Sequence, residues 1–146
     1  MDEVYKIISY LVISFLISLG AKEIDSDFIS KFSSDFITLL TTLLAINIAS
    51  GSLIAGKLKE INLKTGQSFS KTTRELKRSL LIQLILIAIS FVILVLKSST
   101  KISVLIGADM MELISNTITV AIFIYYLDCI MDLGRALFSL LNSNED

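Results

Sequence analysis

The chain has 146 residues, of which 53% are hydrophobic and 18% are charged, and its formal net charge is −1. So much apolar content excludes an ordinary soluble domain and favours a single all-α domain embedded in a membrane. The absence of histidine and a single cysteine, Cys129, exclude an intrachain disulfide and most metal sites, acid–base dyads and catalytic triads. The sequence shows no glycine-rich phosphate loop and no nucleophile–base pair, so we expect no enzymatic activity, cofactor or metal.

The first predicted span covers residues 4–20. Its uncharged core, Ile7–Gly20, holds only fourteen residues, but Lys6 can snorkel outward and so lengthen the apolar stretch. A cleaved signal peptide is the competing interpretation. Because the chain begins with the acidic head MDE, whereas signal peptides begin with a basic segment, we expect the helix to be retained.

The stretch between this span and the next carries four acids and two lysines. Ile24, Phe28 and Phe32 recur every four residues, which predicts either a short amphipathic helix at the membrane surface or a continuation of the first helix. We expect Ser33 or Ser34 to cap the helix that follows.

The second predicted span, residues 36–56, holds twenty-one residues without one charge. This is roughly 31 Å of helix, about the hydrocarbon thickness of a bilayer. A dense basic segment follows, and because positive residues accumulate on the cytoplasmic side, we expect this end of the helix in the cytoplasm. The residues of this segment, which we call the basic set, are Lys57, Lys59, Lys64, Lys71, Arg74, Lys77 and Arg78.

Small residues form one stripe along the second span, with spacings of 4, 3, 4, 3 and 4. Small side chains let helix backbones approach closely in lipid, so we predict that this small stripe packs against another helix. A second line of Asn47, Gly51 and Ala55 lies on nearly the opposite face and predicts a second neighbour. The small stripe consists of Thr38, Thr42, Ala45, Ala49, Ser52 and Gly56.

The second helix is expected to continue into the cytoplasm, supported by an ion pair between Glu60 and Lys64, and to end at Gly66. A third span follows at residues 79–97. Residues 57–78 therefore form a basic helical hairpin that extends beyond the membrane. Three interpretations of this hairpin stay open: topology and anionic lipid headgroups, docking of an acidic cytoplasmic protein, and, least favoured, nucleic-acid binding, because Phe69 is the only aromatic residue among the cations.

Two capping boxes are predicted, one at Thr72 and Glu75 before the third span and one at Asp109 and Glu112 before the fourth. Gly107 is expected to break the chain just ahead of the second box.

The fourth span covers residues 110–131 and is expected to continue as one helix into a cytoplasmic extension, residues 132–146. Asp132 and Arg135 should pair on its wet face, and its apolar face needs cover from the basic hairpin, another subunit, the membrane surface or a soluble partner. The residues we assign to this cytoplasmic helix are Asp128, Asp132, Arg135, Leu137 and Phe138.

Charge distribution fixes the predicted topology. With both termini in the cytoplasm, nine Lys and Arg residues lie inside and four lie outside, which agrees with the positive-inside rule. The inner nine are Lys6, the basic set and Arg135; the outer four are Lys22, Lys31, Lys97 and Lys101. We therefore expect a four-helix bundle with four spans in the bacterial inner membrane.

Polar residues within the spans could line a water path or could only bond helix to helix. This intramembrane polar set consists of Asn47, Gln83, Ser90, Asn116 and Thr119. No charged residue lies at the centre of a span, which argues against a proton- or cation-coupled transporter.

The length, the four apolar runs, the basic loop after the second span and the segment LLTTLLAINIASGSLIAGKLKEI resemble the RexB-like phage-exclusion membrane proteins. The four-span plan is also similar to the KwaA-type component of Kiwa antiphage defence. The resemblance implies a role in defence at the inner membrane.

The leading functional expectation is a non-enzymatic, homo-oligomeric inner-membrane protein of antiphage defence that senses envelope perturbation or permeabilises the membrane. One alternative is a membrane anchor that recruits a soluble cytoplasmic effector through its hairpin and last helix. The other is a small ion channel or transporter. The expected partners are membrane lipids, further copies of the chain and, in the anchor alternative, that effector.

Overall fold

The computed structural model describes residues 3–24, 28–66 and 68–142, except for the side chains of Glu3, Ser30, Ala136, Leu137 and residues 139–142. In the described part of the chain all regular structure is helical, as predicted. The helices, in order, are α1 (Glu3–Glu23), α2 (Phe28–Thr65), α3 (Ser70–Lys97), α4 (Thr100–Ile106) and α5 (Ala108–Asn142).

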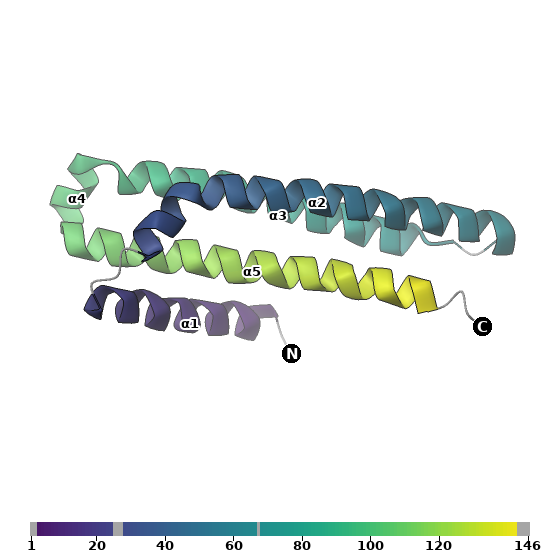
Figure 1. Ribbon diagram of the computed structural model, residues 1–146, viewed down its shortest axis with the longest axis horizontal. Helices are drawn as coiled ribbons and strands as arrows, with labels where there is room; N and C mark the ends of the chain where they lie inside the picture. Colours follow the sequence, from purple (N-terminus) through teal and green to yellow (C-terminus); the bar gives the residue numbers. More distant parts are fainter. Residues whose placement is uncertain (1–2, 25–27, 67, 143–146) are drawn as a thin grey trace.

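The long helices lie side by side (Figure 1). The helices α2 and α3 form a hairpin, α5 packs along both, and α1 packs mainly on α5. We call the end of the molecule where α2 ends and α3 begins the hairpin end, and the opposite end, where the short α4 lies, the α4 end. At the hairpin end, α2 extends furthest, beyond the last turn of α5.

Four helices are long and apolar enough to cross a membrane: Val4–Glu23, Lys31–Thr65, Ser70–Lys97 and Ala108–Arg135. Each of them contains one of the four predicted spans and is longer than it. The helix α5 is continuous through Gly134, as expected, and its 35 residues give a length of roughly 52 Å.

The predicted start of the second helix is wrong. The residues from Phe28 onward already belong to α2, so Ser33 and Ser34 lie inside the helix instead of capping it, and no separate surface helix forms there. The cause is aromatic packing: the ring centroid of Phe32 lies 5.2 Å from those of both Phe36 and Phe123. Burial of these rings against α5 draws the first turns into the bundle.

Both glycine stops are confirmed, and both capping boxes are wrong. Gly66 and Gly107 end α2 and α4 with positive φ angles of 71° and 93°, which glycine adopts without steric cost. Thr72 lies inside α3, which begins at Ser70 because Phe69 packs beneath the hairpin and fixes an earlier start. Asp109 lies in the first turn of α5, where it pairs with Lys22.

Two apolar clusters hold the bundle. The first, between α2 and α5, contains Phe36, Leu40, Ile122 and Tyr126, and the Tyr126 hydroxyl donates a 3.0 Å hydrogen bond to the Leu40 carbonyl. The second lies nearer the hairpin end; its members are Ile54, Leu58 and Leu133, with Phe69 and Leu76 packed against them. The hairpin therefore covers the apolar face of α5 at Leu133.

Candidate functional site

Two ion pairs fasten α1 to α5, one toward each end of α1. Lys6 Nζ lies 3.1 Å from Asp128 Oδ2, and the two side chains are only 30% and 24% exposed. Lys22 Nζ lies 3.4 Å from Asp109 Oδ2 in a more exposed setting at the α4 end. Together with an edge-on contact of Tyr10 and Tyr125, with ring centroids 6.3 Å apart, these pairs set an antiparallel register.

The residues of α1 that take part in this contact recur every four positions. We call them the α1 stripe: Lys6, Tyr10, Ser14, Ser18 and Lys22. Ser14 and Ser18 are almost completely buried, whereas the apolar side chains around them are exposed to the surroundings of the bundle. On α5, Ser115 and Thr119 are also buried. We call the contact of the α1 stripe with α5, which holds the buried hydroxyls of Ser14 and Ser18, the α1–α5 seam.

Three buried hydroxyls of α1 and α5 have no hydrogen-bond partner: those of Ser14 and Ser18 in the seam and that of Ser115 on α5. Hydroxyls in helices commonly donate to a carbonyl of the preceding turn. Thr119 does so, donating to the Ser115 carbonyl at 2.8 Å, and so does the exposed Ser9. A buried hydroxyl without a partner costs about 1–3 kcal/mol, and polar groups of this kind can hold water if the helices part slightly.

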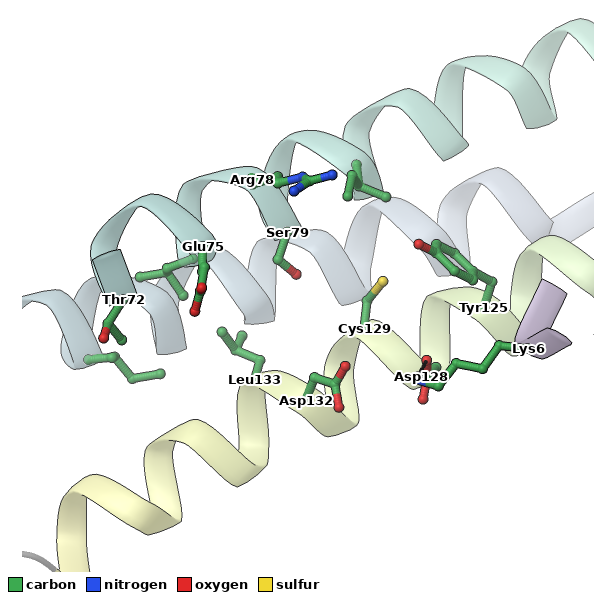
Figure 2. A pocket seen from close by; sticks show the side chains of 13 residues that line it. Lys6, Thr72, Glu75, Arg78, Ser79, Tyr125, Asp128, Cys129, Asp132 and Leu133 are labelled. Atoms are coloured by element: carbon green, nitrogen blue, oxygen red, sulfur yellow. Dashed lines mark hydrogen bonds and ion pairs between the residues drawn. The ribbon is translucent and has the colours of Figure 1, made fainter. Parts of the chain in front are cut away.

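A pocket of about 430 Å³ opens beside the later turns of α5, where α1 begins (Figure 2). Its charged lining residues are Lys6, Glu75, Arg78, Asp128 and Asp132. Its other lining residues are Ile54, Thr72, Leu76, Ser79, Ile82, Tyr125, Cys129 and Leu133. In Figure 2 the carboxylate of Asp132, the hydroxyl of Ser79 and the ring of Tyr125 project into the space between α3 and α5. The pocket is therefore a charged, partly apolar niche beside the Lys6–Asp128 ion pair.

All five residues of the intramembrane polar set are buried. Asn47 Nδ2 donates to Gln83 Oε1 at 2.8 Å and joins α2 to α3, which leaves Gln83 Nε2 without a partner. Lys97 Nζ donates to Asn116 Oδ1 at 2.9 Å near the α4 end. Ser90 donates to a carbonyl of its own helix. The bonds of Gln83 with Asn47 and of Lys97 with Asn116 tie α3 to α2 and α5, and the five residues of the set are not gathered at one point.

The basic set is spread along the exposed sides of the hairpin. Glu60 accepts hydrogen bonds from Lys57 at 3.0 Å and from Lys64 at 2.8 Å, so the predicted Glu60–Lys64 pair forms. Lys71 approaches Glu75 at 4.0 Å. The side chains of Lys59, Arg74 and Lys77 are exposed. Of the basic set, only Arg78 lines the pocket.

The small stripe of α2 is exposed along its whole length. Packing within the chain uses the opposite line instead: Asn47 and Gly51 are buried, and a Cβ at Gly51 would lie 3.4 Å from a Leu76 methyl group. The stripe is thus available to a second molecule, and its role in assembly stays a prediction.

At the end of α5, Arg135 and Asp132 form the predicted pair at 3.4 Å, and Phe138 is exposed. The side chain of Leu137 and the tail from residue 143 lie outside the described residues. Asp128, assigned only to the amphipathic continuation of this helix, is instead the partner of Lys6.

Sequence reasoning missed the α1–α5 seam. The polar residues of α1 recur every four positions, and this spacing is the signal in the sequence for a helix contact on that side. The hydropathy of the segment indicates only that it spans the membrane. Among the described residues, no group of three His, Cys, Asp or Glu side chains could hold a metal ion.

No family model, curated protein or solved structure matches this chain. The resemblance to phage-exclusion and Kiwa membrane proteins therefore remains an expectation.

Proposed function

We propose that this protein permeabilises the bacterial inner membrane in antiphage defence, without catalysis, and that the α1–α5 seam is the path that opens. The observation that carries the proposal is the row of buried hydroxyls without partners, framed by an ion pair at each end. Four helices long and apolar enough to cross a membrane supply the setting. The distribution of Lys and Arg supports placing the hairpin end in the cytoplasm.

The proposed opening has a physical basis in the weak attachment of α1 to the rest of the bundle. This helix packs mainly on α5 and touches α2 only slightly, so its displacement breaks few contacts outside the seam. When the seam widens, water can satisfy the hydroxyls of Ser14, Ser18 and Ser115, which offsets part of the lost packing. A water-lined path then connects the two ion pairs across the apolar layer. Perturbation of the envelope is the event that we expect to shift α1.

The proposal is tested by ion leakage from liposomes that contain the purified protein and a pH-sensitive dye. Wild-type protein should dissipate an imposed proton gradient. The triple variant Ser14→Ala, Ser18→Ala and Ser115→Ala should do so at least about tenfold more slowly, because an apolar seam stays dry.

The matched control replaces three exposed hydroxyls that bond to their own helices: Ser9→Ala, Thr41→Ala and Ser98→Ala. It should leak like the wild type. Liposomes that hold their gradient with wild-type protein, or equal leakage by both triple variants, would contradict the proposal.

The α2–α3 hairpin favours a second candidate, an anchor that recruits an acidic soluble effector. The hairpin extends beyond α5 (Figure 1). Cations including Lys59, Arg74 and Lys77 are exposed along it. Reversing the charge of these three residues should abolish defence in cells while leaving liposome leakage unchanged if the anchor is correct. If the charge-reversed variant keeps both defence in cells and liposome leakage, this candidate is ruled out.

A further inference from the structure

The pocket exists because the helices differ in length. The 21 residues of α1 cover only part of the 35-residue α5, and α1 begins close to Asp128. Beyond this point nothing from α1 covers the groove between α3 and α5, and the groove opens into the 430 Å³ pocket (Figure 2). Pockets that hold small molecules span roughly 300–1,000 Å³, so this space can hold a headgroup and the start of its acyl chains.

The charges of the pocket favour a zwitterion with an exposed positive group. Lys6 and Asp128 neutralise each other at 3.1 Å. Of the remaining charged lining residues, Glu75 and Asp132 are acids and Arg78 is a base. Their present partners are weak, because Asp132 meets Arg135 at 3.4 Å and Glu75 meets Lys71 at 4.0 Å, with side chains mostly exposed. Two acids and one base together match a ligand that carries one ammonium beside one phosphate.

The remaining walls and the location indicate that the ligand is a lipid. Ile54, Leu76 and Leu133 supply an apolar wall. The uncharged stretch of α5 ends at Leu127, directly before the pocket residues Asp128 and Asp132, so in a membrane the pocket lies where hydrocarbon gives way to headgroups.

We propose that this pocket binds an aminophospholipid, with the primary ammonium on Asp132 and Glu75, the phosphate on Arg78 and the glycerol end of the acyl chains against the apolar wall. A primary ammonium donates three hydrogen bonds to carboxylates, whereas a quaternary choline donates none. A headgroup without an amine would leave Asp132 facing a phosphate, which is repulsive. The site therefore discriminates by headgroup. This proposal is independent of the proposed leakage path.

The test is a lipid titration of the full chain in detergent micelles, read by the thermal unfolding midpoint. Phosphatidylethanolamine should raise the midpoint at lower mole fraction than phosphatidylcholine or phosphatidylglycerol, because a ligand that binds the folded state more tightly stabilises it at lower concentration. Asp132→Asn should weaken the apparent affinity for phosphatidylethanolamine about tenfold and remove the preference. The matched control is Asp35→Asn, which changes an exposed acid on α2 that does not line the pocket. This control should retain the preference for phosphatidylethanolamine.

A second variant separates occupation of the pocket from an indirect effect of the charge lost in Asp132→Asn. Ser79→Phe fills the pocket without changing its charges and should also remove the preference. Equal stabilisation by all three lipids, or an unchanged preference in both pocket variants, would overturn the proposal. Stabilisation by soluble phosphoethanolamine as strong as that by the lipid would also overturn it, because the site would then take a soluble zwitterion.

Discussion

At the scale of single residues, buried polar groups decide how the helices meet. Asn47 and Gln83 form a buried side-chain hydrogen bond of 2.8 Å that joins α2 to α3. In an apolar setting such a bond contributes about 1–2 kcal/mol, and an amide left alone is costly.

Gln83→Leu should therefore destabilise the fold by about 1–3 kcal/mol, because Asn47 Nδ2 loses its acceptor in the interior. The double variant Asn47→Leu and Gln83→Leu should be more stable than the sum of the two single variants predicts. A double-mutant cycle based on unfolding in mild detergent measures this coupling. Strictly additive single effects would show that the two amides act separately.

The sequence indicates that Asn47 lies in a helix contact, but it cannot identify the partner, because several polar residues on the other spans are equally available. The same limit applies to Asp128. Its position on an amphipathic face suggested contact with water, and only the fold shows that Lys6, 122 positions earlier, reaches it.

At the scale of helices, the sequence predicts helix existence better than helix starts. Runs of apolar residues and the absence of proline indicate four long helices, and Gly66 and Gly107 give two correct stops. The predicted caps at Ser33 and Thr72 are wrong because partly buried phenylalanines ahead of them pack against the core clusters, and this packing outweighs a capping bond of about 1 kcal/mol. Tertiary packing of this kind has no local signature.

The end of α5 gives a prediction at this scale. Leu133 is 7% exposed in the cluster that joins α5 to the hairpin, so Leu133→Ala should cost about 2–5 kcal/mol of unfolding free energy. Phe138 lies further along the same helix and is 66% exposed. Phe138→Ala should therefore change stability by less than about 0.5 kcal/mol in the isolated chain.

Thermal unfolding of the two variants in detergent provides the comparison. A larger loss for Phe138→Ala than for Leu133→Ala would mean that the exposed end of α5 is covered, for example by a second copy, and that the hairpin contact is not the main support.

At the scale of the whole molecule, one face of α2 is used and the other is left open. The small stripe stays exposed while Asn47 and Gly51 pack on α3. If copies of the chain associate through this stripe, Ala49→Leu should weaken the oligomer, because the larger side chain prevents close approach of two helices. Ala88→Leu, the same change at an exposed site on α3, is the matched control. Mass measurement of detergent-solubilised complexes should show dissociation only for Ala49→Leu; an unchanged mass would assign the stripe to lipid contact.

The central claim, that water enters the α1–α5 seam, is tested most directly by thiol accessibility. In a Cys129→Ser background, Ser14→Cys and Ser18→Cys place a thiol in the seam, and Ile13→Cys and Leu16→Cys place one on the exposed apolar faces of the same helix. A small, charged, membrane-impermeant thiol reagent is then applied to the protein in a leaking membrane, and labelling rates are measured. The account predicts that both seam thiols react at least about tenfold faster than both lipid-facing thiols, because thiolates form and react only where water reaches. Seam thiols that react no faster than the lipid-facing ones would show that the seam stays dry and that the path lies elsewhere.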